Sequence, residues 1–148
     1  MNRVEEAVKR FEGDYNCAQS MLLTYGTPCG LGEEAAAGIA GVFGGGMAGT
    51  GRVCGAVTGA LMSLGLMCAS RADSPAEGKE KAYEAARRFF DEFTSANGTL
   101  LCSELLGFDV GTPEGRELAN RNDVFSRVCP GIVRSAASIF EKVARELA

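Results

Sequence analysis

The feature that most constrains the fold is an uncharged stretch from Val53 to Ser70, which follows a loop dense in glycine. It reads VCGAVTGALMSLGLMCAS, somewhat shorter than the roughly 20 mostly apolar residues of a membrane span. Gly55 and Gly59 form a small-xxx-small spacing, which suits close helix packing in a membrane or in a soluble bundle. Because the other predicted helices carry frequent charges, we favour a central helix of a bundle over membrane insertion.

The preceding segment, FGGGMAGTG at residues 43–51, has glycine at five of its nine positions. That is too many for a helix interior, so the segment is predicted to be a loop that another group approaches closely. It resembles phosphate-binding loops superficially, because a helix follows it. It lacks the GxxxxGK[ST] ending and a preceding strand, which argues against nucleotide binding.

The rest of the chain also shows helical spacing of apolar residues, with recognisable start and stop signals. The first helix ends at Gly13, Asp14 or Asn16 caps the second, and Ser74-Pro75 opens a long helix that Asn97-Gly98 ends. The remaining predictions are a second helix ending at Gly26, a loop at 27–32, a third helix from Glu33, a short helix capped by Thr99, a loop at 107–113, helical segments from Glu114 and about Asp123, and a last helix opened by Pro130. No segment predicts a strand, so the predicted fold is all-α: a single-domain helical bundle over residues 1–148 with a buried glycine-rich central helix.

Composition excludes some functions. The chain has 148 residues, 46% of them hydrophobic, which is enough for one core. Its formal charge of −4 offers no basic surface for nucleic acid. The N-terminal segment mixes acidic and basic residues without an apolar run, so it does not resemble a secretory signal. We therefore expect a cytoplasmic protein, where permanent disulfides are rare.

The chain contains six cysteines and no histidine. The missing histidine removes the commonest general base and metal ligand, so thiols are the main chemical resource. In a reducing compartment such thiols are catalytic, redox-sensing or metal-binding, or they are buried and pack like small apolar residues.

Position along the predicted helices separates the six cysteines, because a helix N-terminus stabilises a thiolate. Four lie near predicted helix starts and are expected to have a lowered pKa: Cys17, Cys54, Cys102 and Cys129. Cys68 lies at the far end of the central helix and is expected to be core, while nothing orients Cys29 in its loop. The four have no CxxC spacing, which argues against thioredoxin-like and zinc-ribbon proteins.

Four segments resemble a known family: YNCAQSMLLTYG, FGGGMAGTGRVCGAVTGALMSLGL, LCSELLG and RVCPGIV. They are similar to the redox-active C-GCAxxG-C-C proteins, small bacterial and archaeal proteins named for this cysteine order. The resemblance spans roughly residues 14–135 and maps the family cysteines to the same four positions, 17, 54, 102 and 129. Val53 departs from the glycine that the family name implies, whereas the run from Cys54 to Gly59 fits. The resemblance implies redox activity without a substrate.

The first functional hypothesis is a thiol redox protein, a thiol-disulfide oxidoreductase acting on a redox partner protein or a small thiol. Cys54 would be the attacking thiolate, favoured by Arg52 and the helix N-terminus. Cys17, Cys102 or Cys129 would resolve the mixed disulfide. Gly55 and Gly59 would let a neighbouring helix and its cysteine approach.

Two alternatives remain open from the sequence. The same four cysteines, Cys17, Cys54, Cys102 and Cys129, could bind zinc or an iron–sulfur cluster. Alternatively, the glycine loop and the central helix could form a non-catalytic oligomer or partner surface, for example beside a membrane transporter. The sequence leaves the substrate, the disulfide pairing and the oligomeric state undetermined.

Overall fold

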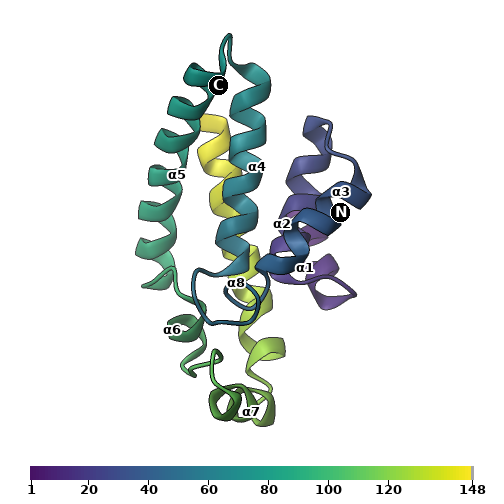
Figure 1. Ribbon diagram of the computed structural model, residues 1–148, viewed down its shortest axis with the longest axis vertical. Coiled ribbons are helices and arrows are strands. Elements are labelled where there is room, and N and C mark those ends of the chain that lie inside the picture. The colour runs from purple at the N-terminus through teal and green to yellow at the C-terminus, as the bar shows by residue number, and fades with distance from the viewer. Residues whose placement is uncertain (148) are drawn as a thin grey trace.

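The computed structural model describes residues 1–147 as helices arranged around one central helix (Figure 1). The elements in chain order are α1 (Arg3–Glu12), α2 (Cys17–Gly26), the 3-10 helix η1 (Thr27–Cys29), α3 (Glu33–Ala40), the 3-10 helix η2 (Gly41–Phe43), α4 (Gly55–Arg71), α5 (Pro75–Asn97), α6 (Cys102–Leu106), α7 (Pro113–Arg121) and α8 (Val124–Glu146). Across the described residues, extended pairing is limited to one isolated antiparallel bridge between Val53 and Leu101. The all-α prediction is confirmed.

Helix α4 is the centre of the bundle. It packs against α2, α5 and α8, and in Figure 1 it stands between α5 and the group formed by α1, α2 and α3. Residues 55–60 are all buried, and Leu64, Met67 and Cys68 continue the buried side toward its C-terminus. The predicted buried central helix is therefore confirmed. Within residues 1–147, no helix has both the length and the apolar character to cross a membrane.

Several predicted helix ends are confirmed by their capping geometry. Asn16 is the N-cap of α2 in a reciprocal capping box, in which its side chain accepts from Gln19 N at 2.9 Å and its backbone N donates to Gln19 Oε1 at 3.0 Å. The Ser74 side chain caps α5, and Gly98 ends it in the left-handed conformation. These local interactions are encoded by a few neighbouring residues, which is why the sequence revealed them.

Two predicted helix starts are wrong. Pro130 does not open the last helix but lies inside α8, which begins at Val124. Proline removes one backbone N–H from a helix, and α8 accommodates that loss because packing of its apolar side on the bundle holds it together. Thr99 does not cap α6: Leu101 is the N-cap, and the Thr99 hydroxyl accepts from Leu101 N at 3.1 Å.

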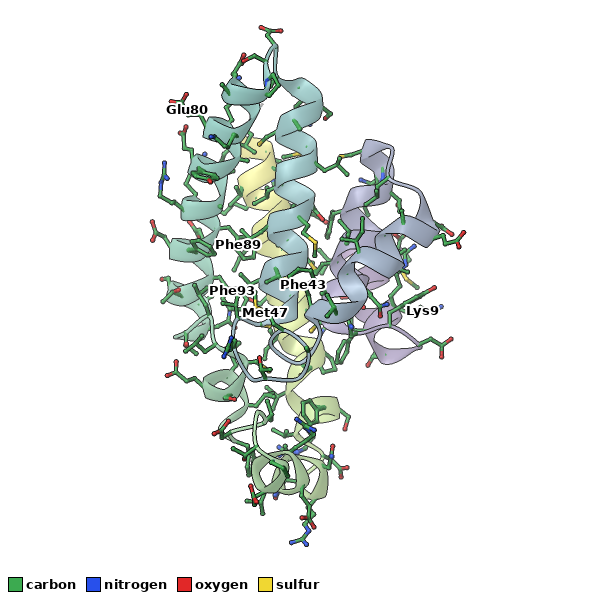
Figure 2. All side chains as sticks on the ribbon, viewed as in Figure 1. Lys9, Phe43, Met47, Glu80, Phe89 and Phe93 are labelled. Carbon is green, nitrogen blue, oxygen red and sulfur yellow. The ribbon has the colours of Figure 1, made fainter. Side chains whose placement is uncertain are left out.

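The core is built from apolar side chains of α2, α4, α5 and α8. Figure 2 shows Phe89 and Phe93 pointing from α5 into the bundle, whereas Glu80 on the same helix points outward. Both rings are fully buried and stack with their centroids 5.8 Å apart. This division of polar and apolar sides fixes the rotation of α5 about its axis.

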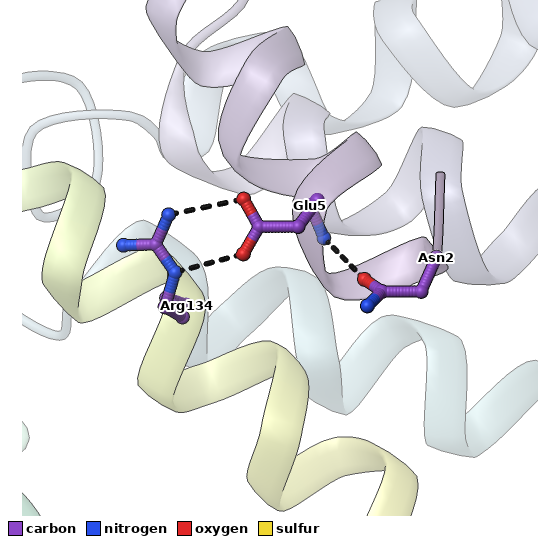
Figure 3. A network of polar contacts seen from close by, with 3 residues as sticks. All are labelled: Asn2, Glu5 and Arg134. Atoms are coloured by element: carbon purple, nitrogen blue, oxygen red, sulfur yellow. Dashed lines mark hydrogen bonds and ion pairs between the residues drawn. The ribbon is translucent and has the colours of Figure 1, made fainter.

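Helix α1 is held to α8 at the surface (Figure 3). The Asn2 side chain accepts from Glu5 N at 2.9 Å, and the Glu5 carboxylate accepts from Arg134 Nε and Nη2 at 3.0 and 3.1 Å. The bond from Arg134 lowers the pKa of Glu5. Exposed pairs contribute little to stability, so this contact serves chiefly to orient α1 against α8.

Gly59 sets the distance between α2 and α4. A Cβ at this position would lie 2.7 Å from the carbonyl oxygen of Ala18 and 2.7 Å from Cβ of Met21. A Cβ on Gly65, which lies further along α4 toward its C-terminus, would meet nothing within 4 Å. The two glycines are therefore a matched pair in one helix.

We predict that Gly59→Ala lowers the free energy of unfolding by about 1–3 kcal/mol, because the added methyl group forces α2 and α4 apart. Gly65→Ala should instead raise it by up to about 1 kcal/mol, since alanine is the better helix former. Urea denaturation followed by far-ultraviolet circular dichroism measures both. Equal effects of the two substitutions would contradict the close approach at Gly59.

Candidate functional site

Four cysteines from four parts of the chain line a single cavity of about 170 Å³. Cys17 is the first residue of α2, Cys54 is the N-cap of α4, Cys102 is the first residue of α6, and Cys129 lies within α8. Apart from Asn16 and Gly45, the rest of the lining is apolar and comprises Phe11, Leu105, Leu106, Phe125, Ile132 and Val133. No charged side chain is among the described residues that line the cavity, so backbone N–H groups and neighbouring thiols are the polar groups available to stabilise a thiolate.

A short backbone pairing places Cys54 beside the segment that carries Cys102. Cys54 N donates to Leu100 O at 2.8 Å, and Cys102 N donates to Arg52 O at 2.6 Å. These bonds flank the bridge between Val53 and Leu101. The start of α4 and the start of α6 are thereby held together, although nearly fifty residues separate them in the chain.

Cys17 reaches the same place because Gly55 has no side chain. A Cβ on Gly55 would overlap Cys17 Sγ, and it would lie 3.0 Å from Phe43 O and 3.1 Å from Ala18 N. The sulfur of Cys17 therefore occupies the space that any larger residue at position 55 would need. Together with Gly59, this residue makes the approach of α2 to α4 possible.

Cys17 and Cys54 are neighbouring thiols that line the same cavity in unequal surroundings. The Cys54 thiol donates to Cys17, and this bond is the largest cause that lowers the pKa of Cys17. Burial acts in the opposite direction, while the backbone N–H groups of Gly45, Ala18 and Cys17 itself lower the pKa further. Cys17 is therefore the member of the pair that ionises first.

The same bond raises the pKa of Cys54 well above its ordinary value, and burial and the negative charge of Cys17 add to this. The backbone N–H groups of Ala56 and Val57 at the start of α4 act against the shift without overcoming it. The pKa of Cys54 therefore moves in the opposite direction to the lowering expected from its position at a helix start. Cys17 has the lower pKa because more hydrogen-bond donors act on its sulfur than on that of Cys54.

The pKa values of the other two cysteines also move upward. Burial, followed by the charge of Cys17, raises the pKa of Cys102 to about 11. Burial, followed by the charges of Cys17 and Cys102, raises the pKa of Cys129 to about 12. The predicted lowering fails because α6 has only five residues and Cys129 lies inside a helix, so burial dominates.

The remaining residues singled out from the sequence lie apart from this cavity. Arg52 is exposed and is not among the groups that shift the pKa of Cys54; its part is the backbone bond to Cys102. Cys68 is only 4% exposed, and burial raises its pKa, which confirms its core assignment. Cys29 is partly exposed in η1, and its thiol donates to Tyr25 O at 3.8 Å.

The sequence did not reveal the contribution of Gly45. Its left-handed backbone, with φ at 64°, turns a loop amide toward Cys17. The loop is held by its own hydrogen bonds, among them Gly51 N to Gly45 O at 3.0 Å and Arg52 N to Gly46 O at 2.9 Å. The only sequence signal was the glycine density, which predicted a close approach without its target.

All six cysteines are free thiols in the structure. Over residues 1–147, no group of three or more His, Cys, Asp or Glu side chains is arranged to hold a metal ion. What the site offers chemically is therefore a polarised pair of neighbouring thiols, with two further thiols on the wall of the same cavity. The redox role of the four cysteines stays a prediction.

An all-helical bundle with thiols from four segments around one cavity defines a class of small cysteine-bearing proteins. The model of the family described as "Putative redox-active protein (C_GCAxxG_C_C)" matches residues 15–143, and the chain belongs to this family. The resemblance noted in the sequence is thereby confirmed. No curated protein and no solved structure matches the chain.

We predict that Cys17 reacts with iodoacetamide at lower pH than the other cavity cysteines. The rate should rise with pH as the thiolate forms and level off below the ordinary thiol pKa of about 8.5, because hydrogen bonds favour the charged form. Replacing Cys54 with Ala removes the largest cause of the shift, so the midpoint should move up. Peptide mass spectrometry across a pH series measures the rate at each cysteine.

Cys54 is the internal reference for this experiment. It should stay unreactive until a higher pH than Cys17. A profile in which Cys54 reacts first would reverse the assignment.

Proposed function

We propose that the protein is a thiol-disulfide oxidoreductase in which Cys17 attacks a substrate disulfide and Cys54 resolves the product. The single observation that carries the proposal is that Gly55 leaves room for the Cys17 sulfur beside Cys54 in one cavity, in surroundings that lower the pKa of Cys17 and raise that of Cys54. Family membership supports redox chemistry in general terms. The roles of the two residues are inferred from this asymmetry.

In the first step, the Cys17 thiolate attacks one sulfur of the substrate disulfide. A bond forms between Cys17 Sγ and that sulfur, the substrate S–S bond breaks, and the other half leaves as a thiolate that takes up a proton. Cys17 is a partly exposed residue that lines the cavity, so a substrate would reach its sulfur through the cavity. The apolar wall around it accepts a small apolar group next to the disulfide.

The second step follows from the loss of charge on Cys17. The hydrogen bond to Cys17 and its negative charge are both causes of the raised pKa of Cys54, and neither remains once Cys17 is in a mixed disulfide. The N–H groups of Ala56 and Val57 then act on Cys54 with less opposition, so its proton leaves more easily. Cys54 attacks Cys17 Sγ, the substrate thiolate departs, and two electrons have passed from the protein to the substrate.

Cavity size supports a small or protruding substrate. About 170 Å³ is less than the 300–1,000 Å³ of sites that enclose drug-sized ligands. A small thiol, or a cysteine with one neighbouring side chain of a partner protein, fits that space better. Cys102 and Cys129 line the same cavity, and in this proposal they would exchange with the Cys17–Cys54 disulfide in a second round.

The alternative is a metal or iron–sulfur protein, and its support is that all four thiols line one cavity. It requires the sulfurs to move closer together, since no metal-binding group is formed among residues 1–147. Anaerobic purification followed by metal analysis and a visible spectrum distinguishes a metal or iron–sulfur protein from the oxidoreductase. Stoichiometric iron or zinc, lost on replacement of Cys102 and Cys129, would favour this alternative over the oxidoreductase.

We predict that mild oxidation with a small disulfide produces a Cys17–Cys54 disulfide, identified by non-reducing peptide mass spectrometry. Cys17→Ser should slow single-turnover reduction of an aromatic disulfide by at least about 100-fold, because the nucleophile is lost. Cys54→Ser should still react but stop at a mixed disulfide on Cys17. Cys68→Ala, which changes a buried cysteine outside the cavity, is the matched control and should react like the unmodified protein.

Full activity of Cys17→Ser would rule out this proposal. So would oxidation that yields no disulfide among the four cavity cysteines while the fold stays intact.

A further inference from the structure

A second concavity, of about 470 Å³, lies at the opposite ends of the helices that carry the thiol cavity. Arg71 is the last residue of α4, whose first turn follows Cys54, and Arg145 lies in the last turn of α8. Tyr25 is near the end of α2, which begins at Cys17. Seventeen helical residues span about 25 Å, so this groove is separate from the thiol cavity.

Three arginines from three helices line this groove: Arg3 of α1, Arg71 of α4 and Arg145 of α8. Over the described part of the chain, none of them forms an ion pair or a side-chain hydrogen bond with another residue; the ion pairs present join other residues. The one carboxylate in the lining, Glu141, already accepts from the Tyr25 hydroxyl at 2.5 Å. Among the described residues that line the groove, three guanidinium groups therefore outnumber one carboxylate, Glu141, and the lining carries an excess of positive charge.

This concentration of positive charge is unusual for the chain. The protein as a whole carries a formal charge of −4. A cation in the last turn of α4 or α8 offsets the negative end of that helix, which accounts for Arg71 and Arg145 one at a time. It does not account for their convergence with Arg3, which comes from the first turn of α1. Convergent guanidinium groups are suited to binding carboxylate or phosphate groups.

Cys29 is the second independent feature of the groove. It lines the same surface, is partly exposed, and bonds through its thiol only weakly, to Tyr25 O at 3.8 Å. Apolar side chains of Pro28, Met67 and Phe140 form the floor beside it. A ligand held by the arginines would therefore lie against a thiol.

We propose that this groove binds small anionic disulfides, those bearing carboxylate groups, and that Cys29 is thiolated by them. The Cys29 thiolate attacks one sulfur of the bound disulfide, and a new S–S bond forms between Cys29 and that half. The original S–S bond breaks, and the other half leaves as a thiolate that takes up the proton given up by Cys29. Cys29 is oxidised to the disulfide level and the departing half is reduced.

The test uses three disulfides of similar size and different charge: dithiodipropionate, which is anionic, hydroxyethyl disulfide, which is neutral, and cystamine, which is cationic. Peptide mass spectrometry gives the rate of thiolation at Cys29 for each. The comparison is made for each reagent between unmodified protein and variants, because the three differ in intrinsic reactivity. Arg71→Gln or Arg145→Gln should slow dithiodipropionate roughly threefold to fivefold, leave hydroxyethyl disulfide unchanged and speed cystamine.

The matched control is Arg87→Gln, an exposed arginine of α5 that does not line the groove, which should change none of the rates. Should the arginine variants fold poorly, the unmodified protein still decides. Raising the salt concentration toward 1 M, where the Debye length is about 3 Å, should slow dithiodipropionate and speed cystamine at Cys29. Thiolation that is insensitive to salt and to the arginines, or no thiolation at Cys29 by dithiodipropionate, would overturn the proposal.

This inference does not depend on the proposed function. The experiment can be repeated in Cys17→Ser, where Cys29 should react at the same rate. Persistence of Cys29 thiolation in an inactive Cys17→Ser protein would support the proposal for the groove, whatever the role of Cys17. Absence of Cys29 thiolation while Cys17 remains active would overturn the proposal for the groove and leave the proposed function standing.

Discussion

The site depends on how closely α2 and α4 approach. Gly55 and Gly59 lie one helical turn apart on α4, and the start of α2 occupies the space where their side chains would be. Backbone contact at this point places the first residue of α2 beside the N-cap of α4. Cys17 and Cys54 become a pair through this contact, although a loop, a helix and a glycine-rich turn separate them in the chain.

The two thiols of that pair differ because their backbone surroundings differ. The glycine loop adds the Gly45 amide to the two N–H groups at the start of α2, so Cys17 is better supplied with hydrogen-bond donors than Cys54. The apolar wall of the cavity strengthens the effect, because electrostatic interactions are stronger in a medium of low dielectric. Charge is thereby favoured on one sulfur although no cationic side chain is among the described residues that line the cavity.

Much of the fold could be predicted from sequence because interactions between residues close together in the chain determine where several helices begin and end. The Asn16 capping box, the Ser74-Pro75 start and the Gly98 end each involve a few adjacent residues. Pro130 was misjudged because a proline that often opens a helix is also tolerated inside one that packs along its length. For such a residue the outcome depends on tertiary packing.

The candidate site was harder to predict. Proximity to helix starts selected four cysteines that the structure brings to one cavity, but the expected direction of the pKa shifts was wrong for three of them. Helix position can be read from sequence spacing, whereas burial of Cys102 and Cys129 and the partner of Cys17 depend on how distant segments meet. The unequal proton affinities within the Cys17–Cys54 pair have one further consequence. Between the two pKa values the pair holds one proton instead of two, so forming its disulfide would release a single proton, and the midpoint potential would vary with acidity half as steeply as that of an ordinary dithiol.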